Sequence, residues 1–179
     1  IKIACVGNSI TYGSGVMNRE KNAYPTQLQN LLGMSYEVQN FGLSGATLLK
    51  KGDKPYWKSN LYTEALQFAP DIVFIKLGTN DSKKQNRLFL DDFDSDLTEL
   101  TQSFKKRNSE ARIVLLLPLP SFAEDSTKIW NPVIKDKIIP SIQKVAYDTK
   151  NEVIDLYQLF VDRSDLLPDK IHPSGLGAS

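Results

Sequence analysis

The stretch Ile1–Gly13 reads I-K-I-A-C-V-G-N-S-I-T-Y-G. It opens with a short, mostly apolar run, which is typical of a strand covered on both faces of a sheet. The run stops at Gly7 and is followed at once by Asn8 and Ser9. In open α/β sheets, ligands bind beyond the carboxyl ends of the strands. The stretch therefore predicts that the Ser9 hydroxyl lies at the ligand-binding edge of a parallel sheet.

The same alternation of short apolar runs and longer amphipathic stretches continues along the chain. Strands are predicted at Ile1–Val6, Tyr36–Asn40, Asp71–Leu77, Arg112–Leu117 and Glu152–Asp155. Helices are predicted near Tyr24–Leu32, Leu61–Phe68, Asp91–Lys106 and Asn131–Thr149. Strands that alternate with helices in this way predict an α/β fold, in which helices cover both faces of a parallel sheet.

Length and composition narrow the class of protein. A chain of 179 residues predicts one domain spanning residues 1–179. Its 22 Lys and Arg against 21 Asp and Glu give no reason to expect a nucleic acid or an anionic membrane as partner. The longest apolar run, at 113–120, is too short to span a bilayer.

The only cysteine, Cys5, excludes an internal disulfide framework and a cysteine-based metal cluster, and is expected to be a small buried hydrophobe.

Both ends of the chain are expected to be cut. The sequence starts at Ile1 rather than at a methionine, and it stops at P-S-G-L-G-A-S, where a C-terminal helix could begin. The absence of a leader therefore leaves the cellular compartment open.

Polar segments follow several of the predicted strands. They are Gly7–Ser9, Asn40–Thr47, Leu77–Asp81 and, beyond the last strand, Asp169–Pro173. All carboxyl ends of a parallel sheet lie at one edge, so these segments can converge there. The only histidine of the chain, His172, lies in the last of them.

This set of residues fits acyl transfer from a serine, which needs a base, a group that orients the base, and donors for the developing oxyanion. We expect Ser9 to be the nucleophile, His172 its base and Asp169 the partner of the imidazole. The oxyanion donors would be the N–H groups of Ser9 and Gly45 and the side-chain amide of Asn80. Taken singly, Ser9 could instead be a helix N-cap, His172 a surface histidine, Asp169 a capping residue and Asn80-Asp81 a turn.

The irregular stretch Thr47–Asn60 is basic and aromatic and is broken by a glycine and a proline. It is either a solvated surface loop or a substrate-facing loop in which Tyr56 and Trp57 form a stacking wall. Asn8 and Asp81, which adjoin the expected catalytic groups, are further candidates for substrate contact.

These segments resemble the conserved blocks of the SGNH (GDSL-type) hydrolase superfamily. The resemblance rests on G-N-S-I-T at 7–11, L-S-G-A-T around Gly45, G-T-N-D at 78–81 and D-K-I-H-P at 169–173, and it spans nearly the whole chain. It implies a flavodoxin-like, three-layer α/β/α sandwich with a five-stranded parallel sheet, and it implies the catalytic roles given above. Asn8 departs from the commonest pattern, which has Asp at this position. The absence of a helix after the histidine block is a second departure.

Within the superfamily, the chain is similar to bacterial sialate O-acetylesterase-type carbohydrate esterases. The resemblance implies an esterase that removes a small acyl group, in the first place acetyl, from a small-molecule or oligosaccharide ester, without metal or organic cofactor. It also suggests a bacterial periplasmic or secreted location. One alternative keeps the triad and acts as a thioesterase or a lysophospholipase-like lipid esterase. An alternative of another class is a non-catalytic carbohydrate-binding module on an esterase fold.

Overall fold

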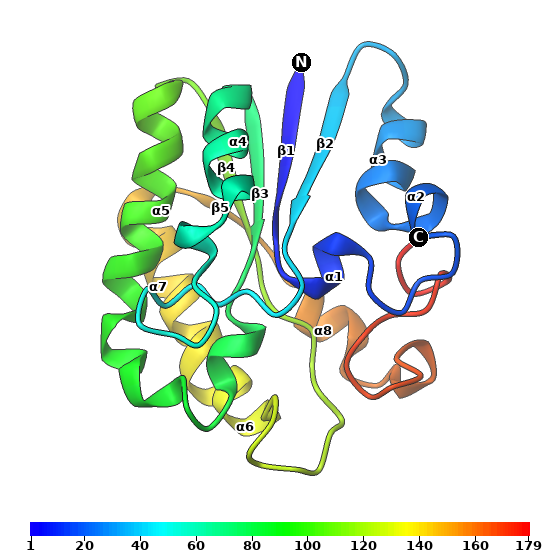
Figure 1. Ribbon diagram of the computed structural model, residues 1–179, viewed down its shortest axis with the longest axis vertical. Helices are drawn as coiled ribbons and strands as arrows, with labels where there is room; N and C mark the ends of the chain where they lie inside the picture. The colour runs from blue at the N-terminus through cyan, green and yellow to red at the C-terminus, as the bar shows by residue number, and fades with distance from the viewer.

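The computed structural model describes residues 1–179 and is organised around a five-stranded parallel sheet (Figure 1). The strands are β1 (Lys2–Gly7), β2 (Glu37–Gly42), β3 (Ile72–Lys76), β4 (Arg112–Leu116) and β5 (Glu152–Ile154). Their order across the sheet is β2-β1-β3-β4-β5. The predicted fold class is confirmed, and each expected strand is present with ends shifted by at most a few residues.

Helices cover both faces of the sheet, as Figure 1 shows. On one face lie α4 (Asn60–Phe68), α5 (Phe93–Arg107) and α7 (Ile139–Thr149), and on the other lie α3 (Tyr24–Leu32) and α8 (Leu156–Phe160). The chain runs from β1 outward to β2, then turns back across the sheet to β3, β4 and β5. Because crossovers between parallel strands are right-handed, this reversal places α4, α5 and α7 on the face opposite to α3. The reversal point, between β1 and β3, is where ligands bind in such folds.

Shorter helical segments complete the fold. They are α1 (Ser9–Tyr12), α2 (Arg19–Asn22), α6 (Asn131–Val133) and the 3-10 turns Tyr56–Lys58, Thr79–Ser82, Arg87–Asp92 and Ser164–Leu166. Two of them, α1 after β1 and Thr79–Ser82 after β3, directly follow strands and so shape the carboxyl edge of the sheet. None of the helices has the length and apolar character that crossing a bilayer requires.

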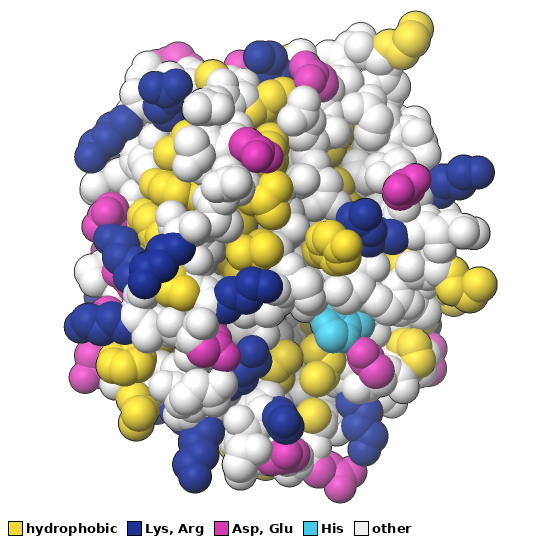
Figure 2. All heavy atoms as spheres, viewed as in Figure 1, with side chains coloured by type: hydrophobic (Ala, Val, Ile, Leu, Met, Phe, Trp, Pro, Cys, Tyr) yellow, Lys and Arg dark blue, Asp and Glu magenta, His cyan; other side chains and the backbone are white.

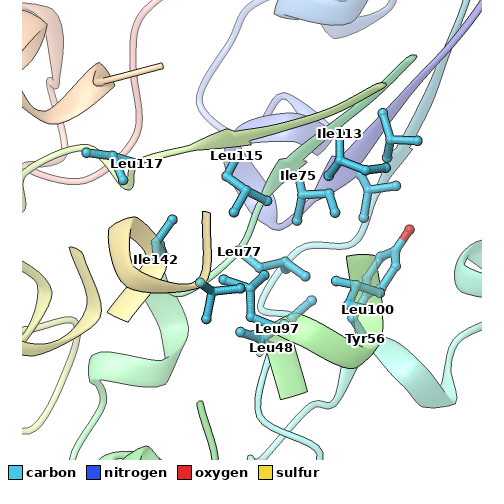
Figure 3. Close-up of a cluster of buried hydrophobic side chains, with 14 of the residues drawn as sticks. Leu48, Tyr56, Ile75, Leu77, Leu97, Leu100, Ile113, Leu115, Leu117 and Ile142 are labelled. Carbon is cyan, nitrogen blue, oxygen red and sulfur yellow. The ribbon is translucent and has the colours of Figure 1, made fainter. Parts of the chain in front are cut away.

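The main core lies between the sheet and the layer of α4, α5 and α7 (Figure 3). Alternate residues of the central strands, including Ile75 and Leu115, point into it and meet Leu97 and Leu100 of α5 and Ile142 of α7. Each of these five side chains is at most 3% exposed. Burying one such side chain contributes about 1.5–3 kcal/mol, so this layer fixes the strands that carry the polar edge.

The helix expected over Asn131–Thr149 is present but not uniform. A π-helical segment, Ile134–Ile138, joins α6 to α7, and Pro140 lies in the first turn of α7. Proline has no N–H to donate, and its ring clashes with the carbonyl four residues earlier in a regular α-helix. The wider π turn before Pro140 accommodates both effects.

The second face of the sheet is covered less completely. Between α3 and α8 lies an apolar groove of about 380 Å³, with Leu28 and Leu31 on one side and Leu159 and Phe160 on the other. Lys76 of β3 also lines this groove, although its side chain is fully buried. Neither Ser9 nor His172 is among the lining residues, but Ile10 and Pro173 beside them are, so one end of the groove adjoins the polar edge of the sheet.

Candidate active site

Ser9 is placed by the tight connection between β1 and α1. It is the first residue of α1, and the Asn8 side chain caps the helix by accepting a hydrogen bond from the N–H of Ile10 at 3.2 Å. Gly7 makes the connection possible, since a Cβ there would lie 2.1 Å from Thr11 Oγ1 and 2.8 Å from the Lys76 carbonyl oxygen. The side chain of Ser9 consequently leaves the end of β1 at the switch point of the sheet.

His172 is held by a local turn that Asp169 organises. One carboxylate oxygen of Asp169, Oδ1, accepts hydrogen bonds from the backbone N–H groups of Ile171 (3.0 Å) and His172 (2.6 Å). The carbonyl of Lys170 accepts from the N–H of Phe122 at 2.9 Å, which ties this turn to the segment after β4. The three-residue spacing between Asp169 and His172 thus allows one carboxylate to shape the turn and face the ring.

In the structure, two hydrogen bonds link the side chains of Ser9, His172 and Asp169 in series. His172 Nε2 lies 2.8 Å from Ser9 Oγ, and His172 Nδ1 lies 2.6 Å from Asp169 Oδ2. Burial disfavours ionisation of Asp169, but hydrogen bonds from the His172 backbone, the His172 ring and Ile171 outweigh it, so the pKa of Asp169 is lowered. Because an ionised Asp169 can only accept a hydrogen bond, it keeps the ring proton on Nδ1 and leaves Nε2 free to accept from the Ser9 hydroxyl.

Three groups are candidate oxyanion donors. Ser9 is the first residue of a helix, so its N–H has no intrahelical acceptor. The N–H of Gly45 makes no hydrogen bond within the protein. The Asn80 amide donates one of its two hydrogens to the carbonyl of Ala46 at 2.9 Å, which leaves the other available. The segment before Gly45 lies against the end of β1, because the Leu43 N–H donates to the Gly7 carbonyl at 2.8 Å.

Asp81 fastens the Gly45 segment to the Asn80 segment. Its carboxylate accepts from the N–H groups of Leu48 (3.1 Å) and Leu49 (2.8 Å). Burial raises the pKa of Asp81 to about 6, against the lowering effect of those hydrogen bonds, so the group is largely ionised at neutral pH. The side chain of Asn86 also holds the Asn80 segment in place, since its Nδ2 donates a hydrogen bond to the Asn80 carbonyl at 2.8 Å.

The structure corrects the sequence-based expectations for the substrate-contacting side chains. Asn8, Tyr56 and Asp81 are all completely buried. The Tyr56 hydroxyl donates to the Phe41 carbonyl at 2.8 Å, so this ring is part of the core. Trp57 donates from Nε1 to the Leu48 carbonyl at 2.6 Å and packs edge-on against Tyr62. Tyr56 therefore has no exposed face for stacking, whereas Trp57 is partly buried and helps to hold the loop in place. Asn8 acts as a helix cap, and its Nδ2 has no partner.

Other residues near the site were not singled out from the sequence. Tyr12 is 39% exposed at the end of α1, with the Arg19 guanidinium over its ring at 4.1 Å. Lys54 donates to the Ser44 carbonyl, next to Gly45, at 2.8 Å. Lys76 is buried in the sheet. The burial of Lys76 could have been predicted, because this lysine interrupts the apolar run I-V-F-I-K-L at 72–77. The contact between Lys54 and Ser44 could not, because it depends on how the loop folds back.

Figure 2 shows the only histidine, in cyan, at the surface of the face that is drawn, with acidic and basic side chains around it. His172 is therefore accessible, whereas Ser9 beneath it is only 6% exposed. No group of three or more His, Cys, Asp or Glu side chains is arranged to hold a metal ion.

With this geometry established, the chain can be compared with known proteins. The model of the GDSL-like lipase/acylhydrolase family matches residues 5–179, and the chain belongs to this family. Membership places it in a class of carboxylic ester hydrolases. An acetylxylan esterase of Xylanibacter ruminicola is 42% identical over 196 residues, which cover 99% of this chain and 41% of that protein. The chain thus spans about two fifths of the length of this curated relative.

Solved structures share the fold at lower identity. A lipase/acylhydrolase from Enterococcus faecalis superposes with a TM-score of 0.78 at 24% identity, covering 99% of this chain and 89% of that one. The carbohydrate acetylesterase Est24 from Sinorhizobium meliloti gives 0.73 at 17% identity, covering 99% and 92%. A mutant of Axe2, an acetyl-xylooligosaccharide esterase from Geobacillus, gives 0.70 at 22% identity, covering 99% and 88%.

Proposed function

We propose that this chain is a serine esterase that removes acetyl groups from a carbohydrate ester. The observation that carries the proposal is the hydrogen-bonded chain from Ser9 Oγ through the His172 ring to Asp169, with distances of 2.8 and 2.6 Å. A hydroxyl paired with an oriented imidazole is the arrangement that nucleophilic acyl transfer requires.

The first half of the reaction transfers the acyl group to the enzyme. Ser9 Oγ attacks the ester carbonyl while His172 Nε2 takes its proton, and Asp169 stabilises the imidazolium. The N–H groups of Ser9 and Gly45 and the Asn80 amide would hold the negative oxygen of the tetrahedral intermediate. The intermediate then collapses, the bond to the sugar oxygen breaks, and His172 returns its proton to that oxygen.

The second half releases the acid. His172 removes a proton from a water molecule, whose oxygen attacks the acyl carbon of the acyl-enzyme. The bond from this carbon to Ser9 Oγ breaks, and the serine takes the proton back from His172. The protein's own residues supply every proton transfer in this sequence.

The choice of an acetylated sugar is supported by the relative that is named an acetylxylan esterase, at 42% identity. The structural neighbours named as carbohydrate acetylesterases agree with it in fold. A lipid ester remains the second candidate within the same chemistry. Ile10 and Pro173, which adjoin Ser9 and His172 in the sequence, line the apolar groove between α3 and α8, and this groove is the feature that would suit a lipid chain.

The proposal predicts that Ser9→Ala abolishes ester turnover and covalent labelling by a fluorophosphonate, with the fold intact. Both depend on a nucleophilic oxygen at Ser9. The measurements are acetate release from acetylated xylooligosaccharides and intact mass after labelling, with circular dichroism as the check on folding. Ser14→Ala is the matched control, since Ser14 is a nearby serine that contacts Ser44 rather than the imidazole.

Activity above a few per cent of wild type in Ser9→Ala would refute the assignment. Wild-type protein that binds the sugar but neither turns over esters nor takes up the label would indicate the non-catalytic module. Faster turnover of octanoyl than of acetyl p-nitrophenyl ester would favour the lipid substrate.

A further inference from the structure

The residues Leu43–Ala46 form a β-turn at the edge of the site. The Ala46 N–H donates to the Leu43 carbonyl at 3.0 Å, and Gly45, the third residue of the turn, has a φ of +82°. With a positive φ at Gly45 and none at Ser44, the turn is of type II, which is why glycine is favoured at its third position. The peptide bond in the middle of the turn joins the Ser44 carbonyl to the Gly45 N–H, and the latter is one of the proposed oxyanion donors.

The orientation of this middle peptide is not fixed by the turn alone. The peptide is trans, so its C=O and N–H point in opposite directions. Type I and type II turns differ mainly by a rotation of this peptide, and glycine at the third position can adopt either form. A flip would exchange the N–H for the C=O and would present an oxygen where the oxyanion needs a donor. Some further contact must therefore select one orientation.

Lys54 supplies that contact. Its Nζ donates to the Ser44 carbonyl at 2.8 Å, and its Cδ lies 3.5 Å from the position that a Cβ on Gly45 would occupy. The backbone of Lys54 is held across from the turn, because its carbonyl accepts from the Thr47 N–H at 2.9 Å. The ammonium is thus delivered by a loop that is hydrogen-bonded to the segment immediately after the turn.

Lys54 also differs from Lys50 and Lys51 of the same loop, which are both paired with carboxylates. Lys50 pairs with Glu99 at 2.6 Å, and Lys51 pairs with Asp92 at 2.8 Å. No carboxylate lies within ion-pairing distance of Lys54, so the Ser44 carbonyl is the acceptor that its ammonium has within the protein. A charged donor makes a hydrogen bond stronger than a neutral one does, and it polarises the peptide so that the N–H at the other end becomes a better donor.

We propose that Lys54 is a positioning residue for the oxyanion site: by holding the Ser44 carbonyl, it keeps the Gly45 N–H directed away from the lysine and available to the reacting oxygen. The proposal rests on the proposed esterase function for the role of Gly45. It does not require Lys54 to touch the substrate, and it gives the basic loop a role at the site that does not depend on Tyr56, which is fully buried.

The test compares Lys54→Met, Lys54→Arg and Lys51→Met in the full chain. Losing an oxyanion donor outright costs about 10²–10³ in kcat, and a turn that still samples the correct orientation should cost less, about tenfold. We expect Lys54→Met to lower kcat about tenfold with KM unchanged, Lys54→Arg to restore most of the rate, and Lys51→Met to match wild type. Equal losses in the two methionine variants, a loss confined to KM, or a Lys54→Met rate within twofold of wild type would overturn the proposal.

A second measurement does not depend on catalysis. The backbone amide resonance of Gly45, followed by ¹H–¹⁵N NMR, should shift or broaden in Lys54→Met and stay unchanged in Lys51→Met. An unmoved Gly45 resonance in Lys54→Met would refute the positioning role even in an active esterase. If instead wild type fails to hydrolyse esters or to react with the fluorophosphonate, the proposed function fails, and the NMR comparison still reports whether Lys54 controls this peptide.

Discussion

At the scale of single residues, the two carboxylate oxygens of Asp169 have different roles. Oδ1 accepts the backbone N–H groups of Ile171 and His172, while Oδ2 faces the imidazole at 2.6 Å. An asparagine could keep its oxygen in the backbone turn while placing an N–H₂ group against Nδ1. The ring would then have to accept at Nδ1 and carry its proton on Nε2, which is the wrong tautomer for a base that acts on Ser9.

We therefore predict that Asp169→Asn lowers kcat by about 10²–10⁴-fold while thermal stability stays near that of wild type. Steady-state kinetics on an acetyl ester, together with a melting curve, checks both parts. Glu124→Gln is a suitable control, since Glu124 pairs with Lys170 on the surface beside the same turn. Unchanged turnover in Asp169→Asn would show that the carboxylate does not orient the base.

At the scale of elements, the site depends on how neighbouring loops are tied together at the sheet edge. Leu48 and Leu49 donate to Asp81, and Asn80 donates to Ala46, so the segments after β2 and β3 hold each other. Gly45 lies at the start of one of these segments and Asn80 in the other. The relative position of the two proposed oxyanion donors thus depends on a buried carboxylate that faces neither substrate nor solvent.

Replacing Asp81 by Asn should weaken this tie. The amide can accept only one of the two backbone N–H groups well, and its own N–H₂ would oppose the other, which leaves a buried donor unsatisfied. We expect a loss of about 1–3 kcal/mol in the free energy of unfolding, together with a lower kcat. Urea denaturation and kinetics at neutral pH measure these effects, with the partly exposed Asp92→Asn as control. A variant as stable and as active as wild type would contradict this account.

The elements themselves were largely predictable. Strands and helices followed from local hydrophobic periodicity, and the bounds of α3 match the prediction. The shared edge of a parallel sheet was enough to expect Ser9 near His172. Tyr56 could not be placed in this way, because its burial depends on the Phe41 carbonyl, which lies fifteen residues earlier in the chain. The role of Lys54 likewise depends on a loop folding back onto Ser44, a contact that leaves no periodic signal.

At the scale of the whole molecule, a charge-bearing side chain sits inside the sheet. Lys76 is completely buried at the end of β3, where its Nζ donates to Thr79 Oγ1 at 3.0 Å and no carboxylate pairs with it. Burial lowers the pKa of Lys76 from 10.5 to about 7. In the window between these values the unfolded chain binds the extra proton and the folded chain does not. The free energy of unfolding should therefore rise with pH from about 7 towards 10.

Lys76→Met should remove this rise and should make the protein more stable at pH 7, because the methionine fills similar space without an ammonium to desolvate. Urea denaturation at pH 7 and at pH 9.5 measures both effects. Lys106→Met, an exposed lysine on α5, controls for the change in net charge. If Lys76→Met is less stable and keeps the pH dependence, the buried lysine is instead a stabilising member of the polar edge.

The distance along the chain between Ser9 and His172 has a consequence for how the enzyme comes into being. Their side chains meet at 2.8 Å, yet 163 positions separate them in the sequence. A ribosome that has just made Ser9 has produced an unreactive alcohol, and the serine stays in that state until the 163 positions up to His172 have been added. Under the proposed mechanism, hydrolytic power arises only when the distant imidazole emerges and docks, so an incomplete copy would carry the nucleophile without the means to use it.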